Sequence, residues 1–314
     1  RNVYMKRLYH LSLASSEEVL FRSHEDYRRA FNCYVLALLK SGSSSFADAF
    51  MSNHIHACLE TKDLKQFSYS FKIGYGLYMN KKYNRRGPLS NSSFFVLEVE
   101  GISHILTALS YVFRNALHHG VSATPFEYPY SSVNVIFRKE LGKFLEPDVL
   151  PAARMWRYLP KNIKLNIPYR MDVYGMFLRE DVTEVKQVEL LYGTPRNFLY
   201  YMNRLSDDKW QDEQQKDEEK SSPITIGLIE NLKGQDVSDL LKNEYGRIRN
   251  SRMTDIDVCQ LIDKEIVPKY RVQSVYELAA GQKAEIGNYL YGKYRMKGVN
   301  VEQLRRCLVM GYRY

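Results

Sequence analysis

The residues best suited to chemistry are His54 and His56, one residue apart in the apolar segment MSNHIHACL at 51–59. The segment is typical of a short strand, and side chains on a strand alternate between its two faces. Both imidazoles therefore point to one side, while Ile55 points into the core behind them. Two imidazoles on a rigid backbone are suited to binding a divalent cation. Such a triplet also arises often by chance, so it does not establish a metal site by itself.

A second set of candidate residues lies in the segment ISHILTALSYVFRNALHHG at 102–120. The segment has a helical period, and Tyr111 and Asn115, four residues apart, share one face of the expected helix. A tyrosine hydroxyl can be the nucleophile of phosphoryl transfer, and an asparagine carbonyl oxygen can bind a metal ion. If this helix packs beside the histidine strand, the four side chains form one site. The alternative is a packed aromatic ring and an amide near the end of a helix.

Three further histidines belong to the same helical segment. We interpret them as surface or helix-end residues: His104, His118 and His119. The pair at 118–119 lies near the carboxyl end of the expected helix, where a histidine interacts favourably with the helix dipole and needs no other role.

Tyr78 is the second choice of nucleophile. It lies in an expected helix at 62–84 that ends in a basic cluster, formed by Lys81, Lys82, Arg85 and Arg86. We interpret this cluster as a DNA-binding surface that contacts phosphates. A solvated charged face is the alternative explanation.

These side chains need a scaffold, and the hydrophobic periodicity predicts one. Strands are expected at 3–13, 46–51, 53–60 and 94–100, and helices at 24–41, 62–84 and 101–119. The order strand, helix, two strands, helix, strand, helix predicts an α+β domain with an antiparallel sheet and helices on one face.

Composition is consistent with a globular protein that binds a polyanion. The chain has 314 residues, 45% of them hydrophobic, which is enough for packed cores without disulfides. The scattered cysteines form no metal-type spacing and predict a reduced, cytoplasmic protein. No apolar run reaches the length of about 18 residues that a membrane span needs, and no signal peptide is apparent. A net charge of +9 and 25 tyrosines suit phosphates and stacked bases.

Four motifs, in the right order, resemble those of the HUH single-tyrosine transposases, in particular the REP-associated tyrosine transposases. The family's asparagine-histidine-hydrophobic-histidine strand corresponds to residues 53–56, and its basic helix end corresponds to YMNKKYNRRG at 78–87. Its tyrosine helix corresponds to YVFRNALHHG at 111–120, and its following turn to EYPYSS at 127–132. The resemblance covers roughly residues 1–135.

The chain departs from the family pattern at three places. Ser52 stands where the family usually has proline, and Ala116 stands where it has proline after the helix asparagine. Both changes leave the chemical groups in place. The segment LSNSS at 89–93 replaces an aromatic-glycine-arginine stretch, which could alter the contacts with DNA.

The resemblance implies a ferredoxin-like core and a metal-dependent reaction on single-stranded DNA. His54, His56 and Asn115 would hold Mg²⁺ or Mn²⁺, a Lewis acid toward the scissile phosphate. Tyr111 would attack beside a DNA hairpin of a repetitive palindromic element, forming a 5′-phosphotyrosine and freeing a 3′-hydroxyl that can later rejoin strands. The resemblance further implies a bacterial, nucleoid-associated protein and a homodimer. The alternative is a domesticated, non-catalytic DNA- or RNA-binding protein that retains the transposase fold.

We expect four parts along the chain. They are a transposase domain at 1–140, a helical extension at 141–205, an acidic linker at 206–223 and a helical domain at 224–314. Residues 274–308 loosely resemble the helix-turn-helix end of the replication initiator DnaA. The recognition helix would then be 299–308, with Arg305 and Arg306 facing DNA. A helical bundle without DNA affinity is the alternative.

Overall fold

The computed structural model describes residues 7–15, 17–90, 93–142, 146–161, 163, 165–203 and 253–311. The predicted acidic linker at 206–223 and the helical pattern at 224–252 lie outside the described residues.

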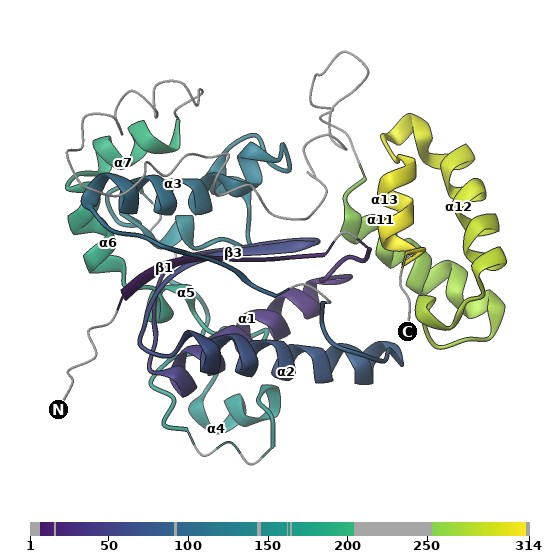
Figure 1. Cartoon of the computed structure of the whole chain (residues 1–314), viewed down its shortest axis with the longest axis horizontal. Helices are drawn as coiled ribbons and strands as arrows, with labels where there is room; N and C mark the ends of the chain where they lie inside the picture. Colours follow the sequence, from purple (N-terminus) through teal and green to yellow (C-terminus); the bar gives the residue numbers. More distant parts are fainter. Residues whose placement is uncertain are drawn as a thin grey trace.

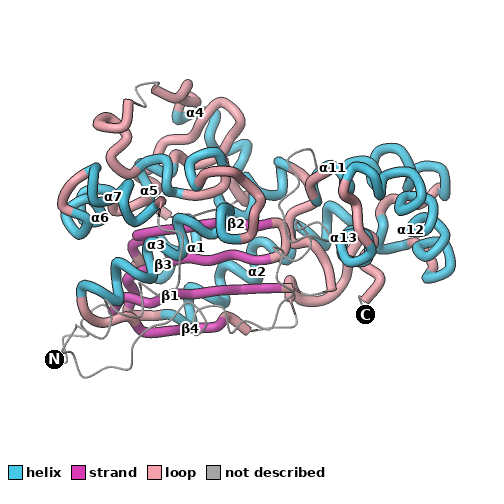
Figure 2. Tube along the Cα trace, turned by 90° about the horizontal axis from the view of Figure 1, so that it is seen from above, coloured by secondary structure: helices cyan, strands magenta, loops and turns pink. Residues whose placement is uncertain are grey.

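A four-stranded antiparallel sheet forms the centre of the N-terminal part (Figure 2). Its elements follow in the order β1 (Arg7–Ala14), α1 (His24–Ser41), β2 (Ser44–Met51), β3 (His54–Thr61), α2 (Leu64–Tyr83), β4 (Phe95–Glu98) and α3 (Ile102–His118). The strands lie side by side as β2-β3-β1-β4, so that the histidine strand β3 has a neighbour on each edge. The predicted α+β class and the predicted order of these elements are confirmed.

The remaining helices follow the sheet domain. The α-helices are α4 (Ala152–Met155), α5 (Arg179–Val182), α6 (Val185–Tyr192), α7 (Pro195–Met202), α11 (Asp255–Leu261), α12 (Ala280–Tyr294) and α13 (Val301–Cys307). The short 3-10 turns are η1 (Pro125–Glu127), η2 (Ser132–Val135), η3 (Trp156–Tyr158), η5 (Val267–Tyr270), η6 (Val275–Glu277) and η7 (Arg295–Lys297), and η4 (Ile262–Ile266) is a π-turn. None of the helices among the described residues is long and apolar enough to cross a membrane.

Helices cover both faces of the sheet (Figure 1). On one face, Leu11 and Ile55 pack in the main core with α1 and α2. On the other face, Cys58 packs in a second core with Leu109 and Val112 of α3. The prediction that the helices share one face is therefore wrong for α3. Because the central strands β1 and β3 are buried on both faces, each set of alternating side chains needs its own cover.

Local sequence fixes where the helices begin and end. Ser23 caps α1 in a capping box with Asp26, and Gly42 ends the helix in the left-handed conformation at φ 60°. After α3, the chain turns at Gly120, whose φ is 62°. This turn holds the last residues of α3 close to the sheet, because Val121 N donates back to the carbonyl oxygen of Ala116 over 2.8 Å.

The C-terminal helices dock on the sheet domain. Arg22, which is fully buried, donates to Asp263 over 2.6 Å and to the carbonyl oxygen of Cys307 over 2.7 Å. Val258 and Ile262 belong to the same core as α1 and α2. The two parts therefore share one hydrophobic core, although they are far apart in the sequence.

Candidate functional site

The predicted site residues of β3 and α3 lie together on the face of the sheet that α3 covers. His54 Nε2 is 3.0 Å from Asn115 Oδ1. The rings of His56 and Tyr111 meet edge to face, with 5.1 Å between their centroids. All four side chains are buried. The arrangement follows from two periodicities, alternation along β3 and the four-residue spacing along α3.

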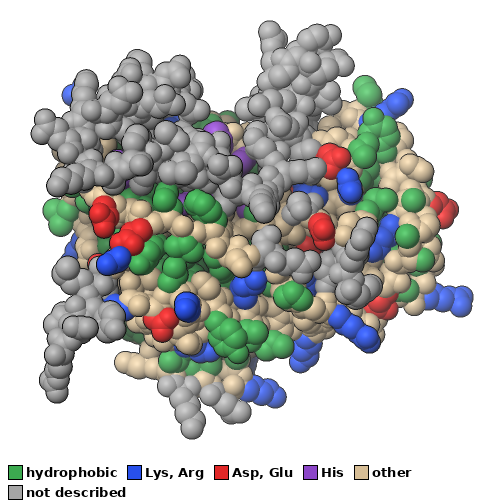
Figure 3. All heavy atoms as spheres, in the orientation of Figure 1, with side chains coloured by type: hydrophobic (Ala, Val, Ile, Leu, Met, Phe, Trp, Pro, Cys, Tyr) green, Lys and Arg blue, Asp and Glu red, His purple; other side chains and the backbone are tan. Residues whose placement is uncertain are grey.

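Five of the chain's seven histidines gather around Tyr111. His10 of β1 stacks on His56 at 5.2 Å between ring centroids, and its ring lies 5.9 Å from that of Tyr111. The ring centroids of His119 and His54 are 4.8 Å apart, and those of His118 and Tyr111 are 6.0 Å apart. We call these five histidines the histidine cluster. Histidine side chains are visible at one place on the face shown in Figure 3.

His10 was not predicted as a site residue, and the environment of His104 differs from the prediction. His118 is exposed near the end of its helix, as expected. His119 lies at the carboxyl end of α3, as expected, although it is only 6% exposed. His104 is only 3% exposed, so its assignment to the surface is wrong. The available signal for His10 was its place in an alternating strand, on the opposite face from Leu11. This signal could not place His10 beside His56, because the sequence does not show that β1 pairs with β3.

The hydrogen bonds of His54 fix where its proton lies. Asn53 donates its amide to the carbonyl oxygen of Ser15 over 3.4 Å, and its Oδ1 lies 2.9 Å from His54 Nδ1. An amide oxygen only accepts, so Nδ1 of His54 carries the proton. In the neutral imidazole, Nε2 then directs a lone pair at Asn115 Oδ1, which is also an acceptor. A proton or a metal cation stabilises two such facing acceptors.

His56 and His10 are held in their neutral forms. His10 Nε2 and His56 Nδ1 share a hydrogen bond of 3.1 Å. Burial lowers the pKa of His10 to about 3. Burial, followed by the nearby imidazole of His54, lowers the pKa of His56 well below its usual value. Neutral imidazole is the form that binds a metal ion.

The residues present fit a divalent cation. In an octahedral magnesium site with bonds of about 2.1 Å, neighbouring ligand atoms are about 3.0 Å apart. That is the separation of His54 Nε2 and Asn115 Oδ1, 3.0 Å. Within the described part of the chain, Asn115 Nδ2 and His10 Nδ1 are buried without a hydrogen-bond partner. No group of three or more His, Cys, Asp or Glu side chains among the described residues could hold a metal ion. Two imidazoles and one amide oxygen would leave coordination positions to water and phosphate.

Tyr78, the second choice of nucleophile, lies away from the histidine cluster. It belongs to α2, which packs on the opposite face of the sheet. Its hydroxyl donates to Asp26 over 2.8 Å. Burial, together with the charge of Asp26, raises its pKa, which disfavours the phenolate needed for attack. The geometry therefore favours Tyr111.

The predicted basic cluster at the end of α2 divides into two pairs. Lys81 and Arg86 are exposed. Lys82 donates to Asp26 over 2.8 Å. Arg85 is buried and donates to Glu18 over 2.7 Å. The predicted contact of Arg85 with DNA is therefore wrong, because its guanidinium is inside the protein and already paired.

The predicted recognition helix also differs from expectation. It forms as α13 (Val301–Cys307), and Arg305 is exposed on it. Arg306 is only 1% exposed and donates to Asp255 over 3.2 Å. The prediction that Arg306 faces DNA is wrong, because this side of the helix packs against α11.

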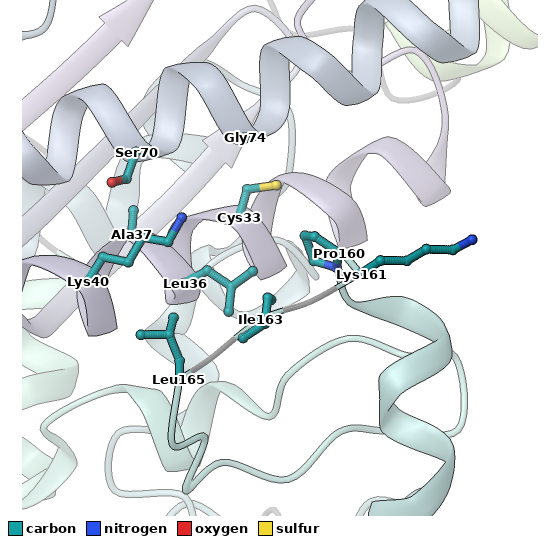
Figure 4. A pocket seen from close by; sticks show the side chains of 10 residues that line it. All are labelled: Cys33, Leu36, Ala37, Lys40, Ser70, Gly74, Pro160, Lys161, Ile163 and Leu165. Atoms are coloured by element: carbon teal, nitrogen blue, oxygen red, sulfur yellow. The ribbon is translucent and has the colours of Figure 1, made fainter.

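A pocket of about 380 Å³ lies away from the histidine cluster, between α1, α2 and the segment at 160–165 (Figure 4). Its lining is mostly apolar, with Lys40 and Lys161 as its cations. Burial raises the pKa of the Cys33 thiol in its wall to about 12, so little thiolate is present at neutral pH. The pocket is not part of the candidate site.

Comparison with known proteins gives one similar structure. No protein-family model matches the chain, and no curated protein matches it. A solved structure of a REP-associated tyrosine transposase bound to a REP hairpin is 13% identical, with a TM-score of 0.37. The alignment covers 47% of this chain and 87% of that chain. The function is therefore inferred from the site itself.

Proposed function

We propose that the protein is a metal-dependent transposase that cleaves and rejoins single-stranded DNA through Tyr111. One observation carries the proposal: His54, His56 and Asn115 meet Tyr111 in one buried cluster. Two imidazoles and an amide oxygen suit a divalent cation, and a phenol beside them is a nucleophile for phosphoryl transfer. The four motifs that resemble HUH single-tyrosine transposases support the same reaction.

The proposed chemistry conserves the energy of the phosphodiester. Mg²⁺ or Mn²⁺ held by His54, His56 and Asn115 would withdraw charge from a non-bridging phosphate oxygen. The hydroxyl of Tyr111 attacks phosphorus in line and releases its proton to water. The bond from phosphorus to the 3′-oxygen breaks, and this oxygen takes up a proton from water, which leaves a 5′-phosphotyrosine and a free 3′-hydroxyl. Attack by the 3′-hydroxyl of another strand reverses the step and rejoins DNA.

The fold supports this proposal by holding the site on rigid elements. The order β1-α1-β2-β3-α2-β4 and the strand arrangement β2-β3-β1-β4 support a ferredoxin-like core. Strands on both edges hold the histidines of β3 in place. Tyr111 and Asn115 come from α3, which packs across them. Sites built on strands and helices are positioned more accurately than sites on loops.

A covalent adduct tests the proposal. Labelled single-stranded hairpins from the repeats that flank the gene are incubated with the protein and Mn²⁺, then separated under denaturing conditions. We expect an adduct that is lost in Tyr111→Phe and in the presence of chelator. Tyr78→Phe is the matched control and should retain it. Adduct formation by Tyr111→Phe at the normal rate would contradict the proposal.

The second candidate is a non-catalytic DNA- or RNA-binding protein that retains the fold. One observation favours it: Tyr111 is only 4% exposed, so DNA reaches its hydroxyl only if neighbouring segments move. Tight binding of the hairpins without any adduct would select this function.

A further inference from the structure

A surface rich in tyrosine and basic residues lies at the end of α12 and on η7. We call it the α12 surface, and its members are Tyr289, Tyr291, Lys293, Tyr294, Arg295 and Lys297. Tyr289 and Tyr291 are 57% and 41% exposed. The three basic side chains are also exposed. Exposed aromatic side chains are informative where they gather, and here two exposed tyrosine rings lie among three cations.

The helical repeat explains why these side chains point outward. Ile286 and Leu290 are buried, and a side chain at Gly287 would come within 3.4 Å of Leu308. One stripe of α12 therefore packs closely on α13. The exposed side chains lie on the two flanks of this stripe, with Tyr289 and Lys293 one turn apart on one flank and Tyr291 on the other. In both views α12 forms the outer edge of the molecule, beyond α11 and α13 (Figures 1 and 2).

Among the described residues, no carboxylate forms an ion pair with the three basic side chains of this surface. Residues 286–301 contain three basic residues and no acidic one. The Lys293 ammonium lies 5.6 Å from the ring centroid of Tyr289 and 5.2 Å from that of Tyr294. The Lys297 ammonium also lies 5.9 Å from the ring centroid of Tyr294, so that both lysines contact aromatic rings. Exposed rings beside uncompensated cations are the pattern that binds stacked bases and the phosphates between them.

We propose that the α12 surface is a binding site for single-stranded DNA. Tyr289 and Tyr291 stack on bases, and Lys293, Arg295 and Lys297 contact phosphates. A single strand fits because a duplex hides the faces of its bases. The site is separate from Tyr111, and it takes the place of the predicted recognition helix, whose Arg306 is buried. Only the choice of DNA over RNA rests on the proposed function.

Fluorescence anisotropy with a labelled 20-nucleotide single strand tests the proposal. The full chain is used as the Tyr111→Phe variant in chelator, so that cleavage does not interfere. The double variant Tyr289→Ala/Tyr291→Ala should bind at least roughly tenfold more weakly, because two stacking contacts with bases are lost. The slope of log affinity against log salt concentration should become less steep by about 1.4 in Lys293→Gln/Lys297→Gln. This corresponds to about 0.7 for each of the two lost phosphate contacts.

Controls separate this site from general effects. Tyr174→Ala changes another tyrosine, 69% exposed, and should leave affinity unchanged. Unaltered thermal unfolding shows that the variants are folded. Equal affinity in the tyrosine double variant would overturn the proposal, as would equally tight binding of duplex DNA. Stronger binding of RNA would overturn the choice of DNA. If the double variant loses affinity and the protein with Tyr111 intact forms no adduct in Mn²⁺, this site is sustained and the transposase is rejected.

Discussion

The hydrogen bond between His10 and His56 links β1 to the candidate metal site. The partner of a ligand histidine's second nitrogen fixes its tautomer and ring orientation, and His10 Nε2 lies 3.1 Å from His56 Nδ1. His10 itself is fully buried. We therefore assign it a positioning role toward the metal ligand His56.

Replacing His10 should weaken metal binding. His10→Gln is expected to lower the affinity for Mn²⁺ by about 10- to 100-fold, the usual effect of losing such a partner. Titration followed by the electron paramagnetic resonance of free Mn²⁺ measures it. His104→Gln, which changes a buried histidine of α3 outside the histidine cluster, is the control. Unchanged affinity in His10→Gln would rule out the positioning role.

The neutral histidines should also make stability depend on pH in metal-free protein. The pKa of His10 is lowered to about 3, whereas unfolded histidine titrates near about 6.5. Between these values the unfolded chain binds more protons, so the free energy of unfolding falls as pH falls below about 6.5. The slope is at most about 1.4 kcal/mol per pH unit for each such histidine.

Urea unfolding in chelator between pH 7.5 and 5 measures this slope. The rings of His56 and Tyr111 face His10, and burial also lowers the pKa of His56. His10→Gln should therefore reduce the slope without abolishing it. A slope that is the same in both proteins would show that His10 does not contribute.

At the scale of elements, the end of α2 has one buried, paired arginine, Arg85, beside exposed basic residues. Arg85 forms a buried pair with Glu18, and the hydroxyl of Tyr276 also donates to Glu18. Tyr276 comes from the C-terminal helices. Glu18, in the segment after β1, thereby joins the end of α2 to the C-terminal part. Removing one partner of such a pair leaves a buried charge uncompensated.

Two neighbouring arginines give a matched test of this buried pair. Arg85→Ala should lower the free energy of unfolding by about 3–5 kcal/mol, because Glu18 stays buried without it. Arg86→Ala, at an exposed position, should change it by less than about 0.5 kcal/mol. Denaturant unfolding of both variants measures the difference. Equal, small effects would show that the Arg85–Glu18 pair is not structural.

At the scale of the whole molecule, the C-terminal helices reach the turn before the histidine strand. Ser52 donates its hydroxyl to Asp255 of α11 over 2.7 Å. Asp255 also accepts from Arg306 over 3.2 Å. Asn53, the next residue, orients His54. A serine at the place where the resembled family has proline is thus explained, because proline carries no hydroxyl for this bond.

Losing the Ser52 hydroxyl should weaken this junction. Ser52→Ala is expected to lower the free energy of unfolding by about 1.5–3 kcal/mol, the usual contribution of a hydrogen bond to a charged group. Because the two parts share one core, unfolding should remain a single transition when followed by circular dichroism and by tryptophan fluorescence. Separate transitions for the two signals would show that the parts fold independently.

The sequence by itself determined what depends on neighbouring residues. The shared face of His54 and His56 follows from the alternation of a strand, and that of Tyr111 and Asn115 from the helical repeat. The α+β class and the order of the elements followed from the same periodicities.

Only the tertiary structure decided which distant residues meet. It set His10 beside His56, because the register of β1 against β3 depends on pairing between strands far apart in sequence. It also placed α3 on the second face of the sheet and buried Arg85 and Arg306, which local sequence cannot distinguish from the exposed Arg86 and Arg305. Whether an arginine contacts solvent or a carboxylate is set by the surfaces that pack around it.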